Sequence, residues 1–374
     1  MQTQDFLRQE GLAALGAQYK ISARRHGTFP NLVLLKYSQI ESPMAEPIVQ
    51  QCRGLIVDEA DDWRIVSRAY DKFFNHGEPN AANIDWTTAR VEEKLDGSLM
   101  MLYHYGNEWR VSSSGLPDAA GMVESSGISF ADLFWQTFKQ LGYALPDAAP
   151  DLCFAFELMT PLNRIVVQHA QSRLVLHGVR DRVTHEELEA APIASRFGWE
   201  CVQSFPLTNV EACLAAACAL DPLRAEGYVV RDANMRRVKI KCPQYVALTH
   251  LKDAVNGRRL LEIIRANESA EFLTYFPQFT GAYERVRREF DSLCEALEAD
   301  YVRLRDIPDQ RAFAAEAVKT RCSSPLFSLR KGSCTTVREH FAGSTIQSLE
   351  RAIGIDLATL IAPLADEDPS ATRP

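Results

Sequence analysis

The sequence predicts an α+β protein, in which a domain of antiparallel sheets is followed by an all-helical C-terminal domain. Short apolar runs of strand length dominate the chain from Asn31 to about Lys241, and a few helical patterns interrupt them. After about Val246 the apolar residues recur at helical spacing, with charged residues between them. Many short strands with occasional helices are typical of an α+β domain built on antiparallel sheets.

The N-terminal part opens with a helical pattern that ends over Leu12–Tyr19. The expected strands follow at Leu32–Tyr37, Gly54–Asp58, Arg64–Ala69, Ser98–Tyr105, Leu152–Leu158, Leu174–Val179, Gly227–Arg231 and Arg237–Lys241. Helical patterns interrupt them at Ser129–Leu141, His185–Ser195 and Val210–Leu220.

The C-terminal part reads as helices. Its clearest pattern consists of Phe290, Leu293, Leu297, Tyr301 and Leu304. Further helices are expected at Asp309–Lys319 and Thr345–Ile353.

This change of pattern predicts a domain boundary near residues 245–255. We therefore expect one domain over residues 1–250 and a second, helical domain over residues 251–374. The tail from Ala365 to Pro374 is acidic and rich in Pro and Ser, which predicts disorder.

Composition excludes some classes of protein. A net charge of −8 and a pI near 5.6 argue against a protein that holds nucleic acid by bulk charge, but they leave room for a local basic groove. The nine cysteines form no CxxC pair and no metal-like spacing with histidines, which predicts buried, reduced thiols. Met1 to Lys20 has no signal-peptide core, and no apolar run approaches the ~20 residues that span a bilayer. We expect a cytoplasmic protein with no membrane partner.

The sharpest local feature is Lys94-Leu95-Asp96-Gly97 before an apolar strand. Taken alone, a lysine on a loop before Asp-Gly is typical of an ordinary hairpin turn. Here it stands in an ordered series with Cys52-Arg53-Gly54, Lys72-Phe73-Phe74-Asn75, Phe156-Glu157, Glu226-Gly227-Tyr228-Val229 and Lys239-Ile240-Lys241. The order of these elements favours a functional site over a turn.

The series resembles the motifs of the covalent nucleotidyltransferase superfamily, which contains ATP-dependent ligases and capping enzymes. Within it, the match is closest to the RNA ligase 1 family of phage-type tRNA-repair ligases, and it covers about residues 30–250. The resemblance implies that residues 1–250 form an adenylyltransferase domain. It also implies an ATP-dependent RNA ligase that joins 3′-hydroxyl and 5′-phosphate ends through a lysyl-AMP intermediate and an adenylated RNA end.

Lys94 is the nucleophile that the resemblance implies. A lysine attacks phosphorus only as the neutral amine, so its pocket has to favour that form. Lys239 and Lys241 alternate on one expected strand and should therefore face the same side. There they would favour the neutral amine and neutralise charge that develops on the phosphates. A solvated lysine stripe on an edge strand is the alternative interpretation of this pair.

The remaining site residues follow from the resemblance. Arg53 and Lys72 would clamp the adenylate and the outgoing phosphates, and Glu157 would contact the AMP ribose. Glu226 would organise Mg²⁺ through water, with Mn²⁺ as an alternative metal.

Asp96 and Gly97 would shape the nucleophile loop, and Asp96 would help in the joining steps. One departure from the family is Ser112-Ser113-Ser114-Gly115, where a lysine beside the glycine is common. That departure puts one phosphate or RNA contact in doubt.

The expected partner is RNA, plausibly a broken tRNA, and the cofactors are ATP and Mg²⁺. The chain has no GxxxxGK[ST] phosphate loop, so a separate polynucleotide kinase-phosphatase would have to heal the ends. The C-terminal helices carry basic clusters that could grip structured RNA or could be solvated faces; their cations are Arg285, Arg287, Arg288, Arg303, Arg305, Lys319, Arg321, Arg330 and Lys331.

Three other functions compete with this one. A degenerate relative could act as an RNA-binding protein only. A related enzyme could adenylate something other than RNA. A DNA ligase or a capping-type nucleotidyltransferase would share the motifs but would normally add a β-barrel after the last of them, whereas this chain turns helical.

Overall fold

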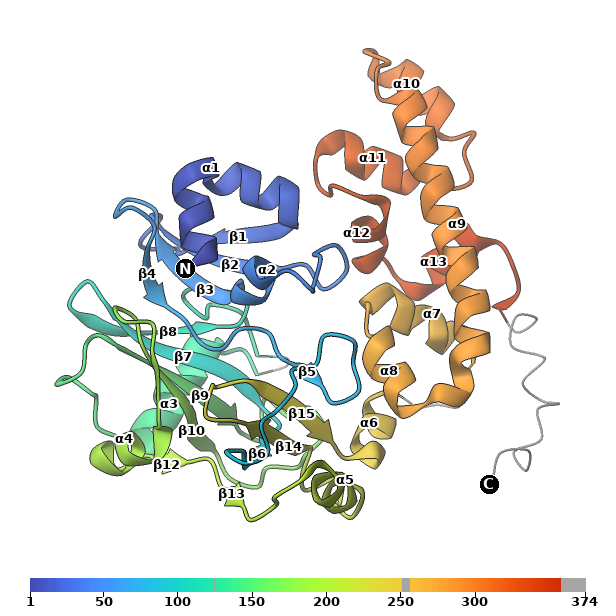
Figure 1. The fold of residues 1–374 in the computed structure, drawn as a ribbon. Coiled ribbons are helices and arrows are strands. Elements are labelled where there is room, and N and C mark those ends of the chain that lie inside the picture. The colour runs from blue at the N-terminus through green and yellow to red at the C-terminus, as the bar shows by residue number, and fades with distance from the viewer. Residues whose placement is uncertain (124–125, 251–255, 358–374) are drawn as a thin grey trace, which may run out of the picture. The chain divides into compact units, whose positions relative to one another are not determined.

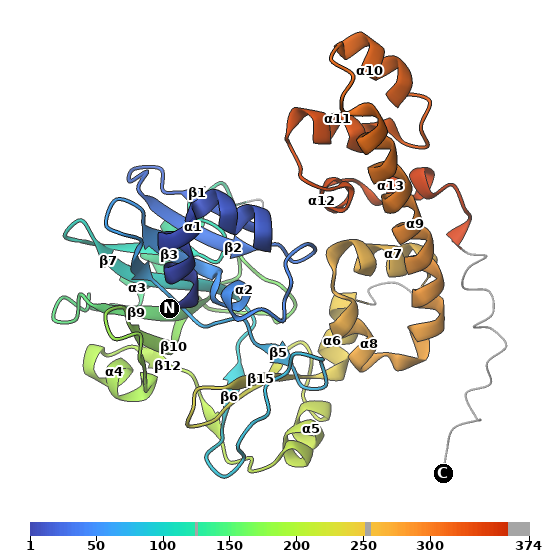
Figure 2. The same cartoon turned by 45° about the horizontal axis from the view of Figure 1, so that its top comes forward.

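The computed structural model describes residues 1–123, 126–250 and 256–357. The chain forms two compact units, of which the first comprises Met1–Ser38 and Ser42–Leu248 (Figures 1 and 2). The second comprises Gln39–Glu41 and the chain from Thr249 onward. Each unit has a hydrophobic core of its own.

The first sheet of unit 1 has the strand order β1-β2-β3-β4 and is antiparallel throughout. Its strands are β1 (Ile21–Arg25), β2 (Leu32–Tyr37), β3 (Arg53–Asp58) and β4 (Arg64–Ser67). One face packs against α1 (Gln2–Tyr19) and α2 (Pro47–Gln51). The other face packs against the second sheet, which is why β2 is apolar on both sides.

The second sheet has the order β11-β10-β9-β7-β8, and β12 pairs with β10. Its strands are β7 (Ser98–Tyr105), β8 (Glu108–Ser113), β9 (Leu152–Met159), β10 (Arg173–Asp181), β11 (Glu187–Leu188) and β12 (Glu200–Cys201). The face turned away from the first sheet packs on α3 (Phe130–Gln140) and α4 (Ala190–Phe197).

The third sheet has the order β13-β6-β14-β15-β5. Its strands are β5 (Phe74–Asn75), β6 (Arg90–Lys94), β13 (Ser204–Phe205), β14 (Gly227–Arg231) and β15 (Arg237–Lys241). Helix α5 (Val210–Cys218) packs on one face through Cys213 and Ala217. The unit ends in α6 (Pro243–His250).

The described part of unit 2 is helical. Its helices are α7 (Gly257–Ala266), α8 (Ser269–Tyr275), the short 3-10 helix η1 (Pro277–Phe279), α9 (Thr280–Leu304), α10 (Gln310–Ala317), α11 (Ser323–Lys331), α12 (Val337–Ala342) and α13 (Ile346–Ile353). Helix α9 runs through the core and buries Phe290, Leu293 and Leu297 against its neighbours.

The predicted fold class is confirmed, since antiparallel sheets are followed by helices. Several elements differ from the prediction. The first helix begins at Gln2 and contains a break at Gly11, where φ is 81°. The helix expected over His185–Ser195 starts only at Ala190, because Glu187–Leu188 pairs with β10. The expected disordered tail lies outside the described residues.

Lys94 was expected on a loop, and this prediction was wrong. The residue closes strand β6, whose sequence Arg90–Lys94 has a single fully apolar side chain and therefore gives no apolar run.

Two expectations from composition can also be compared with the structure. None of the nine cysteines, all of which are described, is in a disulfide. Cys218 is exposed, however, and not buried as expected. Among the described residues, no helix is long and apolar enough to cross a membrane.

Candidate active site

Strand register brings three of the predicted motifs together. Gly227, at the start of β14, pairs with Lys94 of β6 on one side and with Lys241 of β15 on the other. A Cβ atom at Gly227 would lie 2.3 Å from the backbone oxygen of Ile240, so only glycine allows the strands to approach this closely. Residues from three distant parts of the sequence are therefore neighbours in one row across the third sheet.

The carboxylate of Glu226, just before this row, joins two lysines. Its Oε2 lies 2.6 Å from Lys94 Nζ, and its Oε1 lies 3.3 Å from Lys241 Nζ. Only 6% of the Glu226 side chain is exposed, so the carboxylate is a buried anion held between two cations.

Alternation along β15 turns a row of cations to one side. Arg237, Lys239 and Lys241 line the same cavity, as the period of two predicts, while Val238 and Ile240 are buried in the core on the other side. The prediction that Lys239 and Lys241 share one face is confirmed. Because β15 pairs with both β14 and β5, the alternative of a bare edge strand is wrong.

The second sheet supplies the carboxylate on another wall of the cavity. Glu157 lies in β9, between Leu99 of β7 and Val175 of β10. Gly97 lies beside this wall, and a Cβ atom there would be 2.5 Å from the backbone oxygen of Leu158. Gly97 therefore has to be glycine for the strands to meet.

A histidine and a tyrosine that the sequence did not point to hold this wall. His177 Nε2 lies 3.5 Å from Glu157 Oε2, and its Nδ1 lies 2.9 Å from the Tyr70 hydroxyl. The same hydroxyl donates to the His177 backbone oxygen. Burial raises the pKa of Tyr70, so the hydroxyl stays a donor. Gly178 leaves room for Tyr70, since a Cβ atom there would collide with its ring.

The remaining cations come from β3 and from the segment after β4. The Lys72 ammonium lies 4.9 Å from the ring centroid of Tyr37 and 5.1 Å from that of Phe74. The Arg53 guanidinium lies 5.7 Å from the Phe73 ring, and its buried Nη1 has no hydrogen-bond partner within the described structure. An unpartnered buried guanidinium nitrogen is a ready donor for an anionic ligand.

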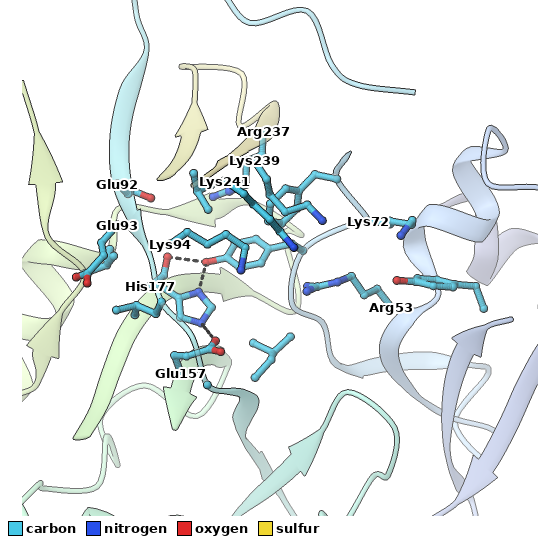
Figure 3. A pocket seen from close by; sticks show the side chains of 18 residues that line it. Arg53, Lys72, Glu92, Glu93, Lys94, Glu157, His177, Arg237, Lys239 and Lys241 are labelled. Atoms are coloured by element: carbon cyan, nitrogen blue, oxygen red, sulfur yellow. Dashed lines mark hydrogen bonds and ion pairs between the residues drawn. The ribbon is translucent and has the colours of Figure 1, made fainter. Parts of the chain in front are cut away.

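Together these walls enclose a cavity of about 320 Å³ (Figure 3). Seven of the nine predicted site residues line it: Arg53, Lys72, Lys94, Gly97, Glu157, Lys239 and Lys241. Lys94 and the cations of β15 point into it from one side, and Arg53 and Lys72 reach in from another.

Asp96 and Glu226 do not line this cavity; with Lys94 they line a neighbouring pocket. Asp96 Oδ1 accepts a hydrogen bond of 2.8 Å from the Tyr245 hydroxyl, and Asp96 Oδ2 accepts from the amides of Val166 and Val167 at 3.0 and 2.7 Å. The carboxylate is buried and ties the turn after Lys94 to α6 and to the chain after β9.

The serine run that departs from the family lies at the end of β8. Ser112 is fully buried, and the Ser113 hydroxyl accepts from the amides of Gly115 and Leu116. A Cβ atom on Gly115 would lie 3.5 Å from Lys36 Nζ, so a lysine from another strand stands beside this glycine.

Sequence reasoning missed several side chains of the cavity, among them Tyr70, Phe73, His177 and Arg237. Phe73 stands inside a recognised motif, so its position was a usable signal. Arg237 continues the alternation of Lys239 and Lys241 on the same predicted strand, so it too was a usable signal. Tyr70 and His177 lie in mixed or apolar segments, where nothing in the sequence separates them from core residues.

The donor set fits a hard divalent cation only if a ligand completes it. No group of three or more His, Cys, Asp or Glu that could hold a metal ion occurs among the described residues. Glu226 lies beside the cavity, in contact with Lys94, and Mg²⁺ typically takes one or two carboxylates together with phosphate oxygens and water. The residues therefore fit a metal that arrives with a nucleotide.

A family profile described as RNA ligase matches residues 51–245, more than half of the chain and all of the motifs that line the cavity. The chain belongs to this RNA ligase family. The family predicted from the ordered motifs is thereby confirmed.

Two proteins similar to this chain come from viruses. "Putative bifunctional polynucleotide kinase/RNA ligase" of Autographa californica nuclear polyhedrosis virus is 29% identical over 290 residues, with 71% of this chain and 40% of that protein covered. "RNA ligase" of Rhodothermus phage RM378 is 31% identical over 286 residues, with 59% of this chain and 65% of that protein covered. The chain thus spans less than two thirds of the length of either relative.

Two solved structures are similar to the RNA ligase family member at low identity. An archaeal ATP-dependent RNA ligase is 13% identical, with 74% of each chain covered and a TM-score of 0.48. A mutant Naegleria gruberi RNA ligase with ATP and Mn is 14% identical, with 43% of this chain and 51% of that chain covered and a TM-score of 0.34.

Proposed function

We propose that this protein is an ATP-dependent RNA ligase that carries AMP covalently on Lys94. The observation that carries the proposal is the position of the Lys94 amine. It lines a nucleotide-sized cavity together with Lys239 and Lys241, and one buried carboxylate lies 2.6 Å from its nitrogen. Family membership supports the same activity.

The cavity suits ATP in its chemistry. Leu99, Val202 and Val229 give it an apolar surface for the base, and Glu157 supplies an acceptor for ribose hydroxyls. Arg53 and Lys72 lie on the aromatic rings of the opposite wall, where they would hold the outgoing phosphates. Arg53 suits this role because its buried Nη1 is a free donor.

In the first step, the Lys94 nitrogen bonds to the α-phosphorus of ATP, and the bond from that phosphorus to the bridging oxygen of pyrophosphate breaks. The ammonium must first lose a proton. Glu226 Oε2 is the atom within reach of that proton. Lys241, on the other oxygen of the same carboxylate, and Lys239 neutralise charge that develops on the phosphates.

A divalent cation, Mg²⁺ or Mn²⁺, would be held by Glu226 and the phosphate oxygens, and it would supply neutralisation of phosphate charge. A carboxylate shared by two lysines can exchange those partners for a stronger cation without being left unpaired.

In the second step, an oxygen of the RNA 5′-phosphate bonds to the AMP phosphorus, and the bond from that phosphorus to Lys94 breaks. In the third step, the 3′-hydroxyl of the other RNA end attacks the 5′-phosphate, and AMP leaves. Asp96 acts here as a positioning residue, because its hydrogen bonds hold the turn that follows Lys94. Repair of a broken tRNA is the proposed setting, with a separate polynucleotide kinase-phosphatase to prepare the ends.

We assign adenylyl transfer to residues 1–250 and RNA selection to the helical domain from residue 251 onward. Many of the basic residues of that domain serve local contacts: Arg287 pairs with Asp291, Arg303 with Asp300 and Lys319 with Glu316. Arg288 and Lys331 are exposed and have no carboxylate partner among the described residues, so they remain the best candidates for RNA phosphates.

The test is covalent labelling. Incubation with α-labelled ATP and Mg²⁺, followed by a denaturing gel, should give a labelled band, whereas GTP should not. Lys94→Ala and Lys94→Arg should both abolish the band, because a guanidinium stays protonated and is no nucleophile. Lys139→Arg, on the exposed face of α3, is the matched control and should label normally. A band that persisted in either Lys94 variant would move the nucleophile elsewhere.

A further inference from the structure

We call the cavity that is lined by Lys94 and Glu157 the nucleotide cavity. A second cavity, of about 370 Å³, shares a wall with it. Tyr70, Lys72, Phe73 and Arg237 line both. We call it the arginine cavity, because it is also lined by Arg68, Arg180 and Arg236. None of these three belongs to the motifs that identify the family.

Positive charge in the arginine cavity exceeds negative charge. Five cations line it, against the two carboxylates Asp71 and Glu187. Glu187 is buried and is shared by Arg180 and Arg237, and Arg68 pairs with Asp71. Arg236 pairs with Asp232 from outside the lining. Even with Asp232 counted, two positive charges remain uncompensated.

One of the arginines has hydrogen-bonding capacity to spare. Arg68 is 9% exposed, and its buried Nε has no partner within the described structure. Burial and the nearby positive charge of Arg68 also lower the pKa of Arg180, which remains charged nonetheless. The guanidinium groups of Arg68 and Arg180 repel each other, and that of Arg68 lacks one hydrogen-bond partner within the described structure. A bound anion would be stabilised at such a site.

The position of the cavity narrows down the anion. When the RNA 5′-phosphate attacks the AMP phosphorus, the incoming oxygen and the departing Lys94 nitrogen lie roughly in line. The 5′-phosphate therefore arrives from the side opposite Lys94, where the proposed phosphate clamp contains Lys72. Lys72 also lines the arginine cavity, so the strand attached to that phosphate leads towards this cavity.

We infer that the arginine cavity binds a backbone phosphate of the RNA strand whose 5′-end is being adenylated. This inference rests on the proposed function, whose cavity shares a wall with the arginine cavity. The rim suits a polynucleotide, because Phe73 adds aromatic surface and Gln50, Asn80 and Asn234 add amide groups.

The test measures three quantities on the full chain. These are the rate of lysyl-AMP formation, the equilibrium affinity for a 5′-phosphorylated oligoribonucleotide without ATP, and inhibition by added pyrophosphate. Arg68→Gln removes the charge with the unpartnered nitrogen. Asn80→Asp puts a negative charge at an exposed rim position without breaking an ion pair, so it stays informative if Arg68→Gln does not fold. Arg25→Gln, an exposed arginine paired with Glu59, is the control.

Both variants should form lysyl-AMP at the wild-type rate and bind the oligonucleotide about tenfold more weakly, because Arg68→Gln removes a charge-assisted hydrogen bond and Asn80→Asp adds a charge that repels the phosphate. The slope of log affinity against log salt should fall by about 0.7 for each phosphate that is no longer neutralised. Wild-type affinity and slope in both variants would overturn the inference while leaving the proposed function intact. A change confined to pyrophosphate inhibition would also overturn it and would assign the cavity to the leaving group. Absence of lysyl-AMP in the wild-type protein would overturn the proposed function and the inference that rests on it. That result comes from the labelling measurement and is therefore distinct from the binding result.

Discussion

Glu226 Oε2 lies 2.6 Å from Lys94 Nζ, so a buried carboxylate contacts the lysine at the centre of the site. The second oxygen of that carboxylate lies 3.3 Å from Lys241 Nζ. Lys94, Glu226 and Lys241 therefore stand in a row. In the proposed mechanism, Lys94 becomes the nucleophile when Glu226 takes its proton or gains another cation.

Glu226→Gln tests this coupling. The amide keeps the shape but removes the negative charge and the proton acceptor, so lysyl-AMP formation should fall by at least about 10²-fold, the usual effect of losing one aligned electrostatic or acid–base group. The measurement is the rate of labelling with α-labelled ATP at saturating Mg²⁺. Glu211→Gln, on the exposed side of α5, is the control. Labelling of the Glu226 variant at the control rate would show that the carboxylate serves only the fold.

Lys239→Ala and Lys241→Ala should block lysyl-AMP formation more than the sealing of pre-adenylated RNA. The triphosphate of ATP carries more charge to neutralise than the single adenylate of the later steps. We expect about 10²-fold loss in the first step and a smaller loss in the last. The check compares labelling from ATP with single-turnover sealing of a pre-adenylated strand. Equal losses in both steps would mean that the two lysines serve the fold or the RNA.

Gly97→Ala should destabilise the protein, because the new Cβ atom would lie 2.5 Å from the Leu158 oxygen and 2.7 Å from Met159 Cγ. Overpacking of this kind costs about 1–3 kcal/mol. The denaturant midpoint should fall, and ATP labelling should fall with it, because Gly97 also lines the cavity. Gly115→Ala is the matched control, since its nearest neighbour is the mobile end of Lys36 at 3.5 Å. Equal midpoints for the two variants would contradict the close approach.

Much of this site could be predicted from the sequence, because its key residues stand in short motifs at the ends of strands. Lys94, Glu226 and Lys241 meet through strand register, which is regular enough for an ordered set of motifs to imply it. The strand β6 itself was missed because its residues are mostly charged. His177 and Tyr70 were missed because their roles depend on a contact between residues 107 positions apart.

The arginine cavity shows the same limit more clearly. Arg68, Arg180 and Arg236 come from three separate segments, and each alone reads as a solvated charge. Only the fold reveals that Arg180 and Arg237 share the single buried carboxylate of Glu187. Excess charge in a cavity is a property of the tertiary structure, so no local sequence pattern predicts it.

The buried thiol of Cys153 should make the free energy of unfolding depend on pH in the alkaline range. Burial raises the pKa of Cys153 to about 11 in the folded protein, from an ordinary value near 8.5. Between these values the unfolded chain releases a proton that the folded chain retains, so the free energy of unfolding falls as pH rises. Cys153→Ala removes this contribution. The stability gap between wild type and variant should therefore narrow above about pH 9, by at most about 1.4 kcal/mol per pH unit. Urea titrations at pH 8 and 10 measure it, and a constant gap would contradict the prediction.

A chain ending at residue 250 should separate chemistry from substrate choice. Among the described residues, the core of unit 2 is formed by residues from Leu260 to Leu357, and none beyond Lys241 lines the nucleotide cavity. The truncated protein should therefore fold, form lysyl-AMP within about twofold of the full chain, and join simple oligonucleotides; a change below about 1 kcal/mol is what removal of a remote unit implies. It should lose its preference for tRNA-like substrates. A second test uses the full chain with Arg288→Glu and Lys331→Glu, which reverses the two exposed charges and keeps the helices. That variant should lose the same preference and show a shallower salt dependence, by about 0.9 in the log–log slope for each duplex phosphate that it no longer neutralises. If a soluble truncated protein kept its full preference for tRNA, the helical domain would have no part in RNA selection.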